Sequence, residues 1–337
     1  MKLRNKKRIV AKLLIFCLLF LVIGCSPRVD KTTDGEESPV NITFIGSVAA
    51  GPLSMIINAI SECVNKSYPG SIVTIVPGNS ITNPSRINKN EADVSVTHNV
   101  TAYAAMKGNP PFKEKNDNIA AIASLYPSVL QIAVDKKAGL TSFDEFINQK
   151  MKLKISIGQP SSNNYILFNQ IIAEYGITID DIHAWGGEIV YQTIDNSTQM
   201  MADGTIDGAV LSSMVPIPNL LEASTGKDFV ILKVDQQVLK NLTEKYNYQL
   251  TTIPADSYPF LKEDIQTVCS RTVIVVPANS PDEMAYKIAL SITENLDYLQ
   301  KVHVSLAGLT PESMVNNLGI QLHPGAEKYY REKAIIK

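Results

Sequence analysis

Short apolar runs alternate along the chain with amphipathic stretches, in an order that predicts strands and helices by turns. Residues 41–46, 71–76 and 92–97 are short runs rich in β-branched residues, as expected for strands. Residues 52–64 carry apolar side chains at helical spacing, and residues 85–91 are long enough for a helical turn. The order strand–helix–strand–helix–strand favours a mostly parallel sheet with helices on its faces.

A second unit repeats this alternation, and a shorter one closes the chain. Its predicted strands are 152–157, 188–193 and 206–211, and its predicted helices are 165–175, 197–203 and 215–222. The closing unit has a predicted strand at 272–276 and predicted helices at 282–299 and 327–333. Loops of small polar residues follow the strands in both larger units. Open α/β sheets bind their ligands at such loops.

The first residues have the pattern of an export signal. A basic stretch, residues 1–12, leads into an apolar run of 11 residues, 13–23, which is short for a membrane span of about 20 residues. The run ends at Val22-Ile23-Gly24-Cys25, which resembles a bacterial lipobox. We therefore expect a signal peptide over 1–24 and a lipid on Cys25. The alternatives are a simple secretory signal with a chance cysteine and an uncleaved anchor.

Composition and charge describe an exported globular protein with an acidic surface. The chain has 337 residues, which corresponds to one large or two ordinary domains, and 45% of them are hydrophobic. The first 24 residues hold six of the 31 basic residues and no acidic one, so the remainder carries 25 basic against 33 acidic residues, a net charge of −8. Such a surface argues against nucleic acid or an anionic membrane as the main partner.

Two features of the part after the signal bear on its attachment and its redox state. Residues 25–40 are polar and lack aromatic residues, so they are expected to form a flexible, lipidated tether. Only Cys63 and Cys269 remain beyond it. They are either a disulfide pair, as an oxidising compartment allows, or two isolated buried thiols.

No constellation of catalytic residues is visible in the sequence. The four histidines, at positions 98, 183, 303 and 323, form no HExxH motif or close pair, and no cysteine cluster points to zinc. A P-loop, a Rossmann glycine triplet and a Gly-x-Ser-x-Gly elbow are also missing from the sequence. We expect no catalytic residues, metal or cofactor. His323 is interpreted as packing and turn structure before the last helix.

Several short motifs occur together in the order typical of one family. They are Ser80-x-x-Asn83, Asn90–Val94, Ile122–Pro127, Ile157–Asn163, Asp203–Gly208 and His323–Glu332. In this order, behind a lipobox, they resemble the TAXI family, the extracytoplasmic solute receptors of tripartite TRAP transporters. The resemblance covers roughly residues 41–334.

The resemblance implies a type II periplasmic-binding-protein fold: two α/β lobes joined by crossing strands, with an interlobe ligand cleft. It places residues 41–130 and 265–337 in lobe 1 and residues 131–264 in lobe 2. It also implies capture of a small carboxylate or amino acid, glutamate-like compounds included, by lobe closure and delivery to TRAP-type membrane permease subunits. The alternatives are a receptor for an ABC-type importer or a sensor, an exported enzyme on the same fold, and a surface interaction protein.

The loops depart from the family pattern, which is richer in glycine. Here the first loop is Gly46–Leu53, the second contains Gly78-Asn79-Ser80, and the third reads Pro160–Asn164. More amide side chains and fewer bare glycines suit a ligand with more hydrogen-bonding groups, or a smaller one. Glutamate itself therefore does not follow from the resemblance.

The candidate ligand-binding residues are polar or small side chains at the ends of strands. They are Gly46, Ser47, Asn79, Ser80, Asn83, Thr97, Asn99, Tyr126, Ser161, Ser162, Asn163, Ser212, Ser213 and Met214. Hydroxyls and free backbone N–H groups at a helix start suit a carboxylate. Each loop also has a structural explanation, as a helix cap or a turn. His98, Arg86 and Lys107 are interpreted as structural or solvated.

Overall fold

The computed structural model describes residues 38–46, 52–160 and 162–337, and the chain from Pro39 to Lys337 forms one compact unit. The predicted signal peptide and nearly all of the tether, with Cys25, lie outside the described residues, as do Ser47 and Ser161. No helix in the described ranges is both long and apolar enough to cross a membrane.

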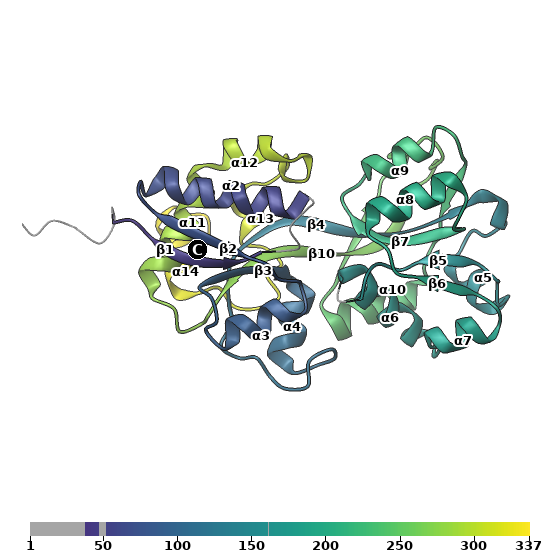
Figure 1. The fold of residues 1–337 in the computed structure, drawn as a ribbon, viewed down its shortest axis with the longest axis horizontal. Helices are drawn as coiled ribbons and strands as arrows, with labels where there is room; N and C mark the ends of the chain where they lie inside the picture. Colours follow the sequence, from purple (N-terminus) through teal and green to yellow (C-terminus); the bar gives the residue numbers. More distant parts are fainter. Residues whose placement is uncertain (1–37, 47–51, 161) are drawn as a thin grey trace, which may run out of the picture. The chain divides into compact units, whose positions relative to one another are not determined.

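The strands of the described residues form one mixed sheet in the order β2-β1-β3-β10-β4-β7-β5-β6, with β8 paired to β4 and β9 to β10 (Figure 1). Their bounds are β1 (Asn41–Ile45), β2 (Ile72–Val76), β3 (Val94–His98), β4 (Ala120–Asp135), β5 (Lys154–Ser156), β6 (Glu188–Val190), β7 (Gly208–Ser213), β8 (Phe229–Ile231), β9 (Gln249–Ile253) and β10 (Ile265–Val276). Strands β1, β2 and β3 are parallel, and so are β5, β6 and β7. Both groups therefore match the predicted parallel units.

The two long strands β4 and β10 run from one parallel group to the other (Figure 1). They pair with each other in antiparallel orientation from Val276↔Ala120 to Cys269↔Val129. The end of β10 pairs with β3, whereas the end of β4 pairs with β7. These are the crossing strands that the family resemblance implies, and the fold is a mixed α/β fold of the periplasmic-binding-protein type.

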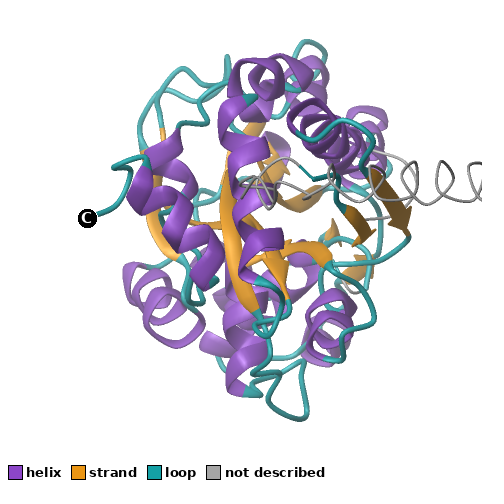
Figure 2. Cartoon of the chain, turned by 90° about the vertical axis from the view of Figure 1, so that its left-hand side faces the viewer, coloured by secondary structure: helices purple, strands orange, loops and turns teal. Residues whose placement is uncertain are grey.

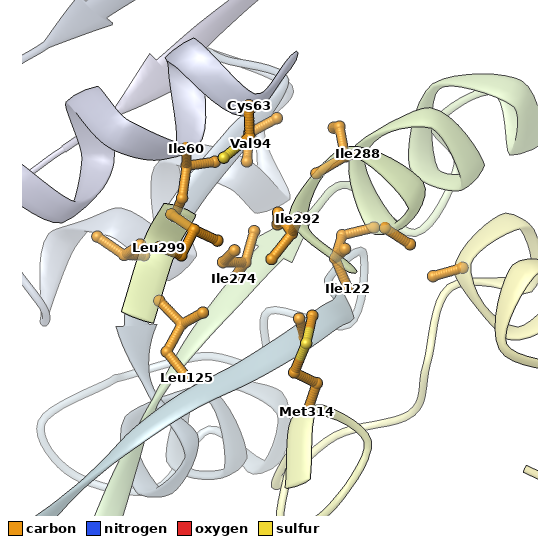
Figure 3. Packing of buried hydrophobic residues seen from close by; sticks show 14 of the residues in the cluster. Ile60, Cys63, Val94, Ile122, Leu125, Ile274, Ile288, Ile292, Leu299 and Met314 are labelled. Carbon is orange, nitrogen blue, oxygen red and sulfur yellow. The ribbon is translucent and has the colours of Figure 1, made fainter. Parts of the chain in front are cut away.

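Helices cover both faces of the strands (Figure 2). They are α2 (Pro52–Ser67), α3 (Thr82–Asn88), α4 (Asn99–Lys107), α5 (Phe143–Asn148), α6 (Asn163–Glu174), α7 (Ile179–Ala184), α8 (Ile194–Asp203), α9 (Pro218–Ala223), α10 (Gln236–Tyr246), α11 (Asp282–Glu294), α12 (Leu296–Val302), α13 (Pro311–Met314) and α14 (Pro324–Glu332), with short 3-10 turns at Lys136–Ala138 and Val304–Leu306. In the first lobe, by which we mean the elements around β1, β2 and β3, α2 and α11 cover one face and share a core with Val94 and Ile274 (Figure 3).

Separate cores lie at the two ends of the crossing strands. The other face of the first lobe is packed around Ile45, Ile87 and Val273. The second lobe, the elements around β5, β6 and β7, has one core around Phe143 and Phe168 and another made of side chains from β7, β8 and β10. Each lobe therefore buries its own apolar faces on both sides of its part of the sheet. The lobe boundaries given above remain a prediction.

The helix prediction differs from the structure in several places, and α5, α7, α10 and α13 were not predicted. Helix α3 begins at Thr82, three residues before the predicted turn, and α4 follows β3 without a loop where no helix was predicted. The predicted helix 282–299 is two helices, α11 and α12, which meet at Asn295. The Asn295 Nδ2 donates to Ser291 O at 2.9 Å and to Ser67 Oγ of α2 at 3.0 Å, so its side chain competes with the helical backbone.

The two cysteines are free and buried, which decides between the two alternatives left open by the sequence. Cys63 packs in the first-lobe core with α11, whereas Cys269 packs with Phe229 in a core of the second lobe. Burial raises the pKa of the Cys63 thiol to about 12 and also raises that of Cys269. Both are therefore inert, protonated thiols at neutral pH.

Candidate functional site

The carboxyl ends of the parallel strands bring the predicted loops to matching edges of the two lobes. In the first lobe, loops 46–51 and 77–81 follow β1 and β2, and α4 follows β3. In the second lobe, loops 157–162, 191–193 and 214–217 follow β5, β6 and β7. Because parallel strands end at one edge of a sheet, the described residues that follow the strands of one lobe lie at the same edge.

The first group is held by the side chain of Asn83. Its Nδ2 donates to Gly46 O at 3.0 Å and to Val96 O at 2.8 Å, and its Oδ1 accepts from Asn79 N at 2.9 Å. The side chain is only 1% exposed. These three bonds join the ends of β1, β2 and β3, so Asn83 is a structural brace in this structure.

The polar side chains near Asn83 also form hydrogen bonds with backbone groups. The Thr97 Oγ1 donates to Ser80 O at 2.8 Å, and the Asn79 Oδ1 accepts from the N–H groups of Ile81 and Thr82. A Cβ on Gly78 would lie 2.2 Å from Asn83 Oδ1 and 2.4 Å from Ile45 Cγ2, so only glycine fits there. We call Gly46, Gly78, Asn79, Ser80, Asn83 and Thr97 the first-lobe loop cluster.

A second polar cluster lies where the crossing strands meet the two lobes. We call His98, Asn99, Ser128, Asn163, Ser212, Ser270 and Arg271 the joint cluster. The Asn163 Nδ2, at the start of α6, donates to Ser212 Oγ of β7 at 3.0 Å and to Ser270 Oγ of β10 at 3.2 Å. Ser270 Oγ lies 3.4 Å from His98 Nδ1 at the end of β3. The chain of contacts therefore runs from the first lobe through β10 to the second.

Two amide atoms of the joint cluster are buried without a partner among the described residues: Asn163 Oδ1 and Asn99 Nδ2. Asn163 is 6% exposed and Asn99 is fully buried. The other end of each amide is fixed, because Asn163 Nδ2 holds the two serines and Asn99 Oδ1 accepts from Arg271 N at 2.8 Å. An unsatisfied buried polar atom costs about 1–3 kcal/mol, so both atoms are candidates for contact with a ligand.

Arg271 brings a positive charge to the joint cluster. Its Nε donates to Ser124 Oγ at 2.5 Å and its Nη2 to Leu125 O at 2.9 Å, both on β4. No carboxylate pairs with this half-buried guanidinium in the described part of the chain. Burial lowers the pKa of Arg271, which remains protonated because the ordinary value is so high. The charge is therefore partly desolvated without a counter-ion.

Burial moves the pKa of both His98 and Tyr126 further from neutral pH, so both side chains are uncharged there. Burial lowers the pKa of His98 to about 4, so its imidazole is uncharged at neutral pH. Burial raises the pKa of the Tyr126 hydroxyl, and a hydrogen bond with the Thr272 side chain opposes part of that rise. Tyr126 packs against the first-lobe core on β4, close in sequence to Ser124 and Ser128.

The remaining predicted residues belong to the second lobe. Ser162 caps α6, its Oγ accepting from Tyr165 N at 3.3 Å. Ser213 and Met214 are half-buried at the end of β7, where Gln131 Nε2 donates to Met214 O at 3.0 Å. Tyr258 donates to Gln131 Oε1 and accepts from Ile217 N at 2.7 Å. Two fully buried side chains thus fix the loop after β7.

The other charged or titratable residues weighed from the sequence lie apart from the joint cluster. Arg86 pairs with Glu91 at 3.1 Å and donates to Pro77 O, and Lys107 is exposed at the end of α4. His323 is buried and caps α14 by accepting from Gly325 N, which confirms its structural interpretation. No group of three or more His, Cys, Asp or Glu side chains within the described ranges could hold a metal ion.

Sequence reasoning missed Arg271, Ser270 and Ser128. The signal for Arg271 was present, since it is the one charged residue within an otherwise uncharged run over Thr267–Val276. The two serines carry no comparable signal, because their role depends on the pairing of β10 with β4.

A family model described as NMT1-like matches residues 51–334. The chain belongs to the NMT1-like family, which corresponds to the TAXI-type solute receptors of TRAP transporters. This confirms the family resemblance seen in the sequence.

Several solved structures have the same fold as this chain. MatC (Rpa3494) from Rhodopseudomonas palustris, solved with malate, is 16% identical, with 89% of this chain and 100% of that chain covered and a TM-score of 0.51. PhnD1 from Prochlorococcus marinus, in complex with methylphosphonate, is 14% identical over 89% and 100%, with a TM-score of 0.50. A TctC solute binding protein from Polaromonas is 13% identical over 89% and 99%, also at 0.50.

The family and the fold together define the broad role. The protein is an extracytoplasmic solute-binding receptor of a transporter, and its partners include a small-molecule ligand. The solved structures that it resembles are binding proteins, not enzymes.

Proposed function

We propose that this receptor serves a TRAP-type transporter and captures a small carboxylate or amino acid, glutamate-like compounds among them, by closing its two lobes. The observation that carries the proposal is the joint cluster. Asn99 of the first lobe and Asn163 of the second each have one buried polar atom without a partner among the described residues, and both side chains contact β10, the strand that also carries Arg271. A carboxylate accepts from the open Asn99 Nδ2 and pairs with a guanidinium, whereas the open Asn163 Oδ1 accepts from a hydroxyl or ammonium group of the ligand.

The proposed ligand-binding groups come mainly from the predicted set. Asn99 and Asn163 contribute their open amide atoms, and the hydroxyls of Ser162 and Ser213 complete the second-lobe side. Ser47 and Ser161 are retained from the sequence prediction. The polar atoms of Asn83 and Thr97 are occupied by backbone groups, so these residues act by shaping the loops.

Closure provides the coupling between binding and delivery. A ligand that bridges both lobes binds the closed state more tightly and shifts the population toward it. The closed receptor would then present one surface to the membrane subunits. We further propose that the lipid on Cys25, after removal of residues 1–24, holds the receptor at the membrane.

The proposal is tested with the full chain purified in detergent. A thermal-shift panel should contain small monocarboxylates, dicarboxylates and amino acids, with methylphosphonate and an alkyl sulfonate as other anions. At about 100 times the dissociation constant, a true ligand stabilises the fold by about 2.7 kcal/mol. X-ray scattering with the same compound should then show a smaller radius of gyration. A panel without any stabilising compound, or binding without compaction, would contradict lobe-closing capture.

The membrane part of the proposal has a separate test. Mass spectrometry of the protein from its membrane fraction should show a lipid mass on a chain that begins at Cys25. Cys25→Ala should release the protein from that fraction while leaving ligand binding unchanged. An unmodified Cys25 or an intact residue 1–24 segment would contradict the anchor.

A further inference from the structure

One face of β10 carries the contacts of the joint cluster that link the two lobes. Successive residues of a strand point to opposite faces, so Ser270 and Thr272 share one face and Arg271 points to the other. In the register of β10 with β3, Thr272 lies directly opposite His98. Residues that lie opposite each other have their side chains on the same face, so His98 belongs to the face of Ser270.

Asn163 of the second lobe contacts the same face. Its Nδ2 donates to Ser270 Oγ at 3.2 Å and to Ser212 Oγ of β7 at 3.0 Å. Ser270 Oγ in turn lies 3.4 Å from His98 Nδ1. One hydroxyl of a crossing strand therefore joins an amide of the second lobe to an imidazole of the first.

The direction of each hydrogen bond in this chain follows from the number of protons, because a serine has one hydroxyl proton. Ser212 Oγ donates to Ser128 O at 3.4 Å, so towards Asn163 it acts as an acceptor. The atom of Asn163 that faces the serines is therefore the amide nitrogen. Ser270 Oγ accepts from the same nitrogen, and its other partner among the described residues is His98 Nδ1, to which it donates.

This direction fixes the tautomer of His98. Burial lowers the pKa of His98 to about 4, so at neutral pH the ring is uncharged and has one N–H group. A proton on Nδ1 would leave the hydroxyl of Ser270, which is 1% exposed, without an acceptor in the described part of the chain. With Nδ1 as the acceptor, the ring proton lies on Nε2.

The Nε2–H group of His98 is a donor with a fixed orientation and no partner. Within the described ranges, His98 forms no hydrogen bond other than that with Ser270. Its side chain is half-buried rather than sealed in a core, so a small molecule can reach it. His98 is also the last residue of β3, at the carboxyl edge where open α/β sheets bind their ligands.

We propose that His98 binds the ligand by donating from Nε2 to an oxygen atom of a carboxylate or carbonyl group, and that Ser270 is the positioning residue that keeps the proton on Nε2. This inference rests on the proposed function and deepens it by one named contact. A neutral N–H group binds an oxygen acceptor, whereas an ammonium group has no lone pair to offer it. His98 therefore contacts the acceptor end of the ligand.

Two variants that each replace one half of the imidazole test the contact. The amide of glutamine reaches the position of Nε2, whereas the amide of asparagine reaches only the position of Nδ1. The affinity of the full chain is measured by calorimetry for L-glutamate, L-alanine, L-malate and L-lactate. For the compound that binds, His98→Asn should lower affinity at least about tenfold, and His98→Gln at most about threefold. His183→Asn, the same change at an exposed histidine, should leave affinity unchanged.

The outcomes separate this inference from the proposed function. If His98→Asn binds as tightly as His98→Gln, the contact is overturned and the receptor function remains. If none of the four compounds binds the unaltered protein, the proposed capture of a carboxylate or amino acid and the contact with His98 are both overturned.

The role of Ser270 has a readout that does not depend on any ligand. Nitrogen NMR of the full chain, labelled at the histidine ring nitrogens, distinguishes the two neutral tautomers, and the spectrum of His98→Gln identifies the signals of His98. At neutral pH the ring should be protonated at Nε2 in the unaltered protein. Ser270→Ala should populate both tautomers, and Ser270→Thr, which keeps a hydroxyl, should restore the Nε2 form.

Affinity should follow the tautomer in these variants. Ser270→Ala should bind the same compound at least about threefold more weakly, and Ser270→Thr should regain most of that loss. A ring protonated at Nδ1 in the unaltered protein would overturn the inference. A Ser270→Ala variant that keeps the Nε2 form would show that Ser270 does not position the proton, which overturns its role.

Discussion

The first-lobe loop cluster and the joint cluster are both built from asparagines, serines and threonines at strand ends, but they use these side chains differently. In the first-lobe loop cluster, the side chains of Asn83 and Thr97 form hydrogen bonds with backbone groups of neighbouring segments. In the joint cluster, Asn99 and Asn163 each have one buried atom without a partner in the part of the chain that the structure describes. The first arrangement stabilises a loop, and the second is the position that we propose for a ligand.

The difference shows that residue type at a strand end does not distinguish a scaffold from a binding site. Burial does not distinguish them either, since Asn83 is 1% exposed and Asn99 fully buried. What differs is whether each polar atom has a protein partner. Substitutions in the two clusters should therefore separate stability from affinity.

The largest effect is expected for Asn83→Ala. The substitution removes three hydrogen bonds and leaves Gly46 O, Val96 O and Asn79 N to find new partners. We expect a loss of about 2–4 kcal/mol in the free energy of unfolding, measured by urea denaturation. Asn88→Ala, a half-buried asparagine on the same helix, is the control. A loss below that of the control would mean that Asn83 is not a brace.

Asn163→Ala should lower ligand affinity more than it lowers stability, in contrast to Asn83→Ala. The side chain contacts only hydroxyls within the protein, so the loss of stability should be about 1 kcal/mol. Ligand affinity, measured by calorimetry, should fall at least about tenfold because the open acceptor is gone. The neighbouring Asn164→Ala is the matched control, since its Nδ2 donates to Val210 O at 3.3 Å and should affect stability alone. Equal losses of affinity in the two variants would contradict the distinction.

A pH effect of intermediate size is expected at His98. Its pKa is lowered from about 6.5 to about 4 by burial, so the folded state binds fewer protons than the unfolded state between these values. Stability should therefore be complete above pH 6.5 and be lost as the pH falls toward 4, by at most about 1.4 kcal/mol per pH unit from this group.

The measurement for His98 is a difference between two pH profiles. The melting temperature is followed from pH 7 to pH 4 in the unaltered protein and in His98→Gln. The carboxylates of Glu174 and Asp181, whose pKa values are lowered in the folded state, also make stability fall in acid. Their contribution is the same in both proteins and is removed when one profile is subtracted from the other. The variant should lose stability less steeply. Parallel profiles would show that His98 is not buried as a neutral group.

The sequence predicted the parallel units well because their strands and helices have clear periods. Strands β1, β2 and β7 lie within two residues of their predicted bounds. Helix α4 was missed because its residues, NVTAYAAMK, have a weak amphipathic pattern and follow β3 directly. The break at Asn295 depends on a contact with Ser67 of α2, far away in sequence, which no local pattern reveals.

The candidate site was harder to predict for the same physical reason. Strand-end loops could be found from their composition, and Asn99, Asn163 and Ser212 were among the residues chosen. These residues differ from a scaffold residue such as Asn83 in whether their polar atoms have hydrogen-bond partners. The partners depend on the register of β10 with β4 and β3, which the sequence does not reveal. Arg271 entered only with the structure, because its side chain forms hydrogen bonds with Ser124 and Leu125 on the neighbouring strand β4.

The smallest effect is expected for Ser80→Ala, in the first-lobe loop cluster. The Ser80 carbonyl accepts from Thr97 Oγ1, and alanine keeps that carbonyl, whereas the hydroxyl has no partner among the described residues. The free energy of unfolding should change by less than about 0.5 kcal/mol. Thr97→Val removes the donor of the same bond and should cost about 1 kcal/mol. If Ser80→Ala costs more than Thr97→Val, the hydroxyl rather than the backbone holds the loop, and the first-lobe loop cluster is not the scaffold described here. A fall in affinity without a fall in stability would instead assign the Ser80 hydroxyl to the ligand.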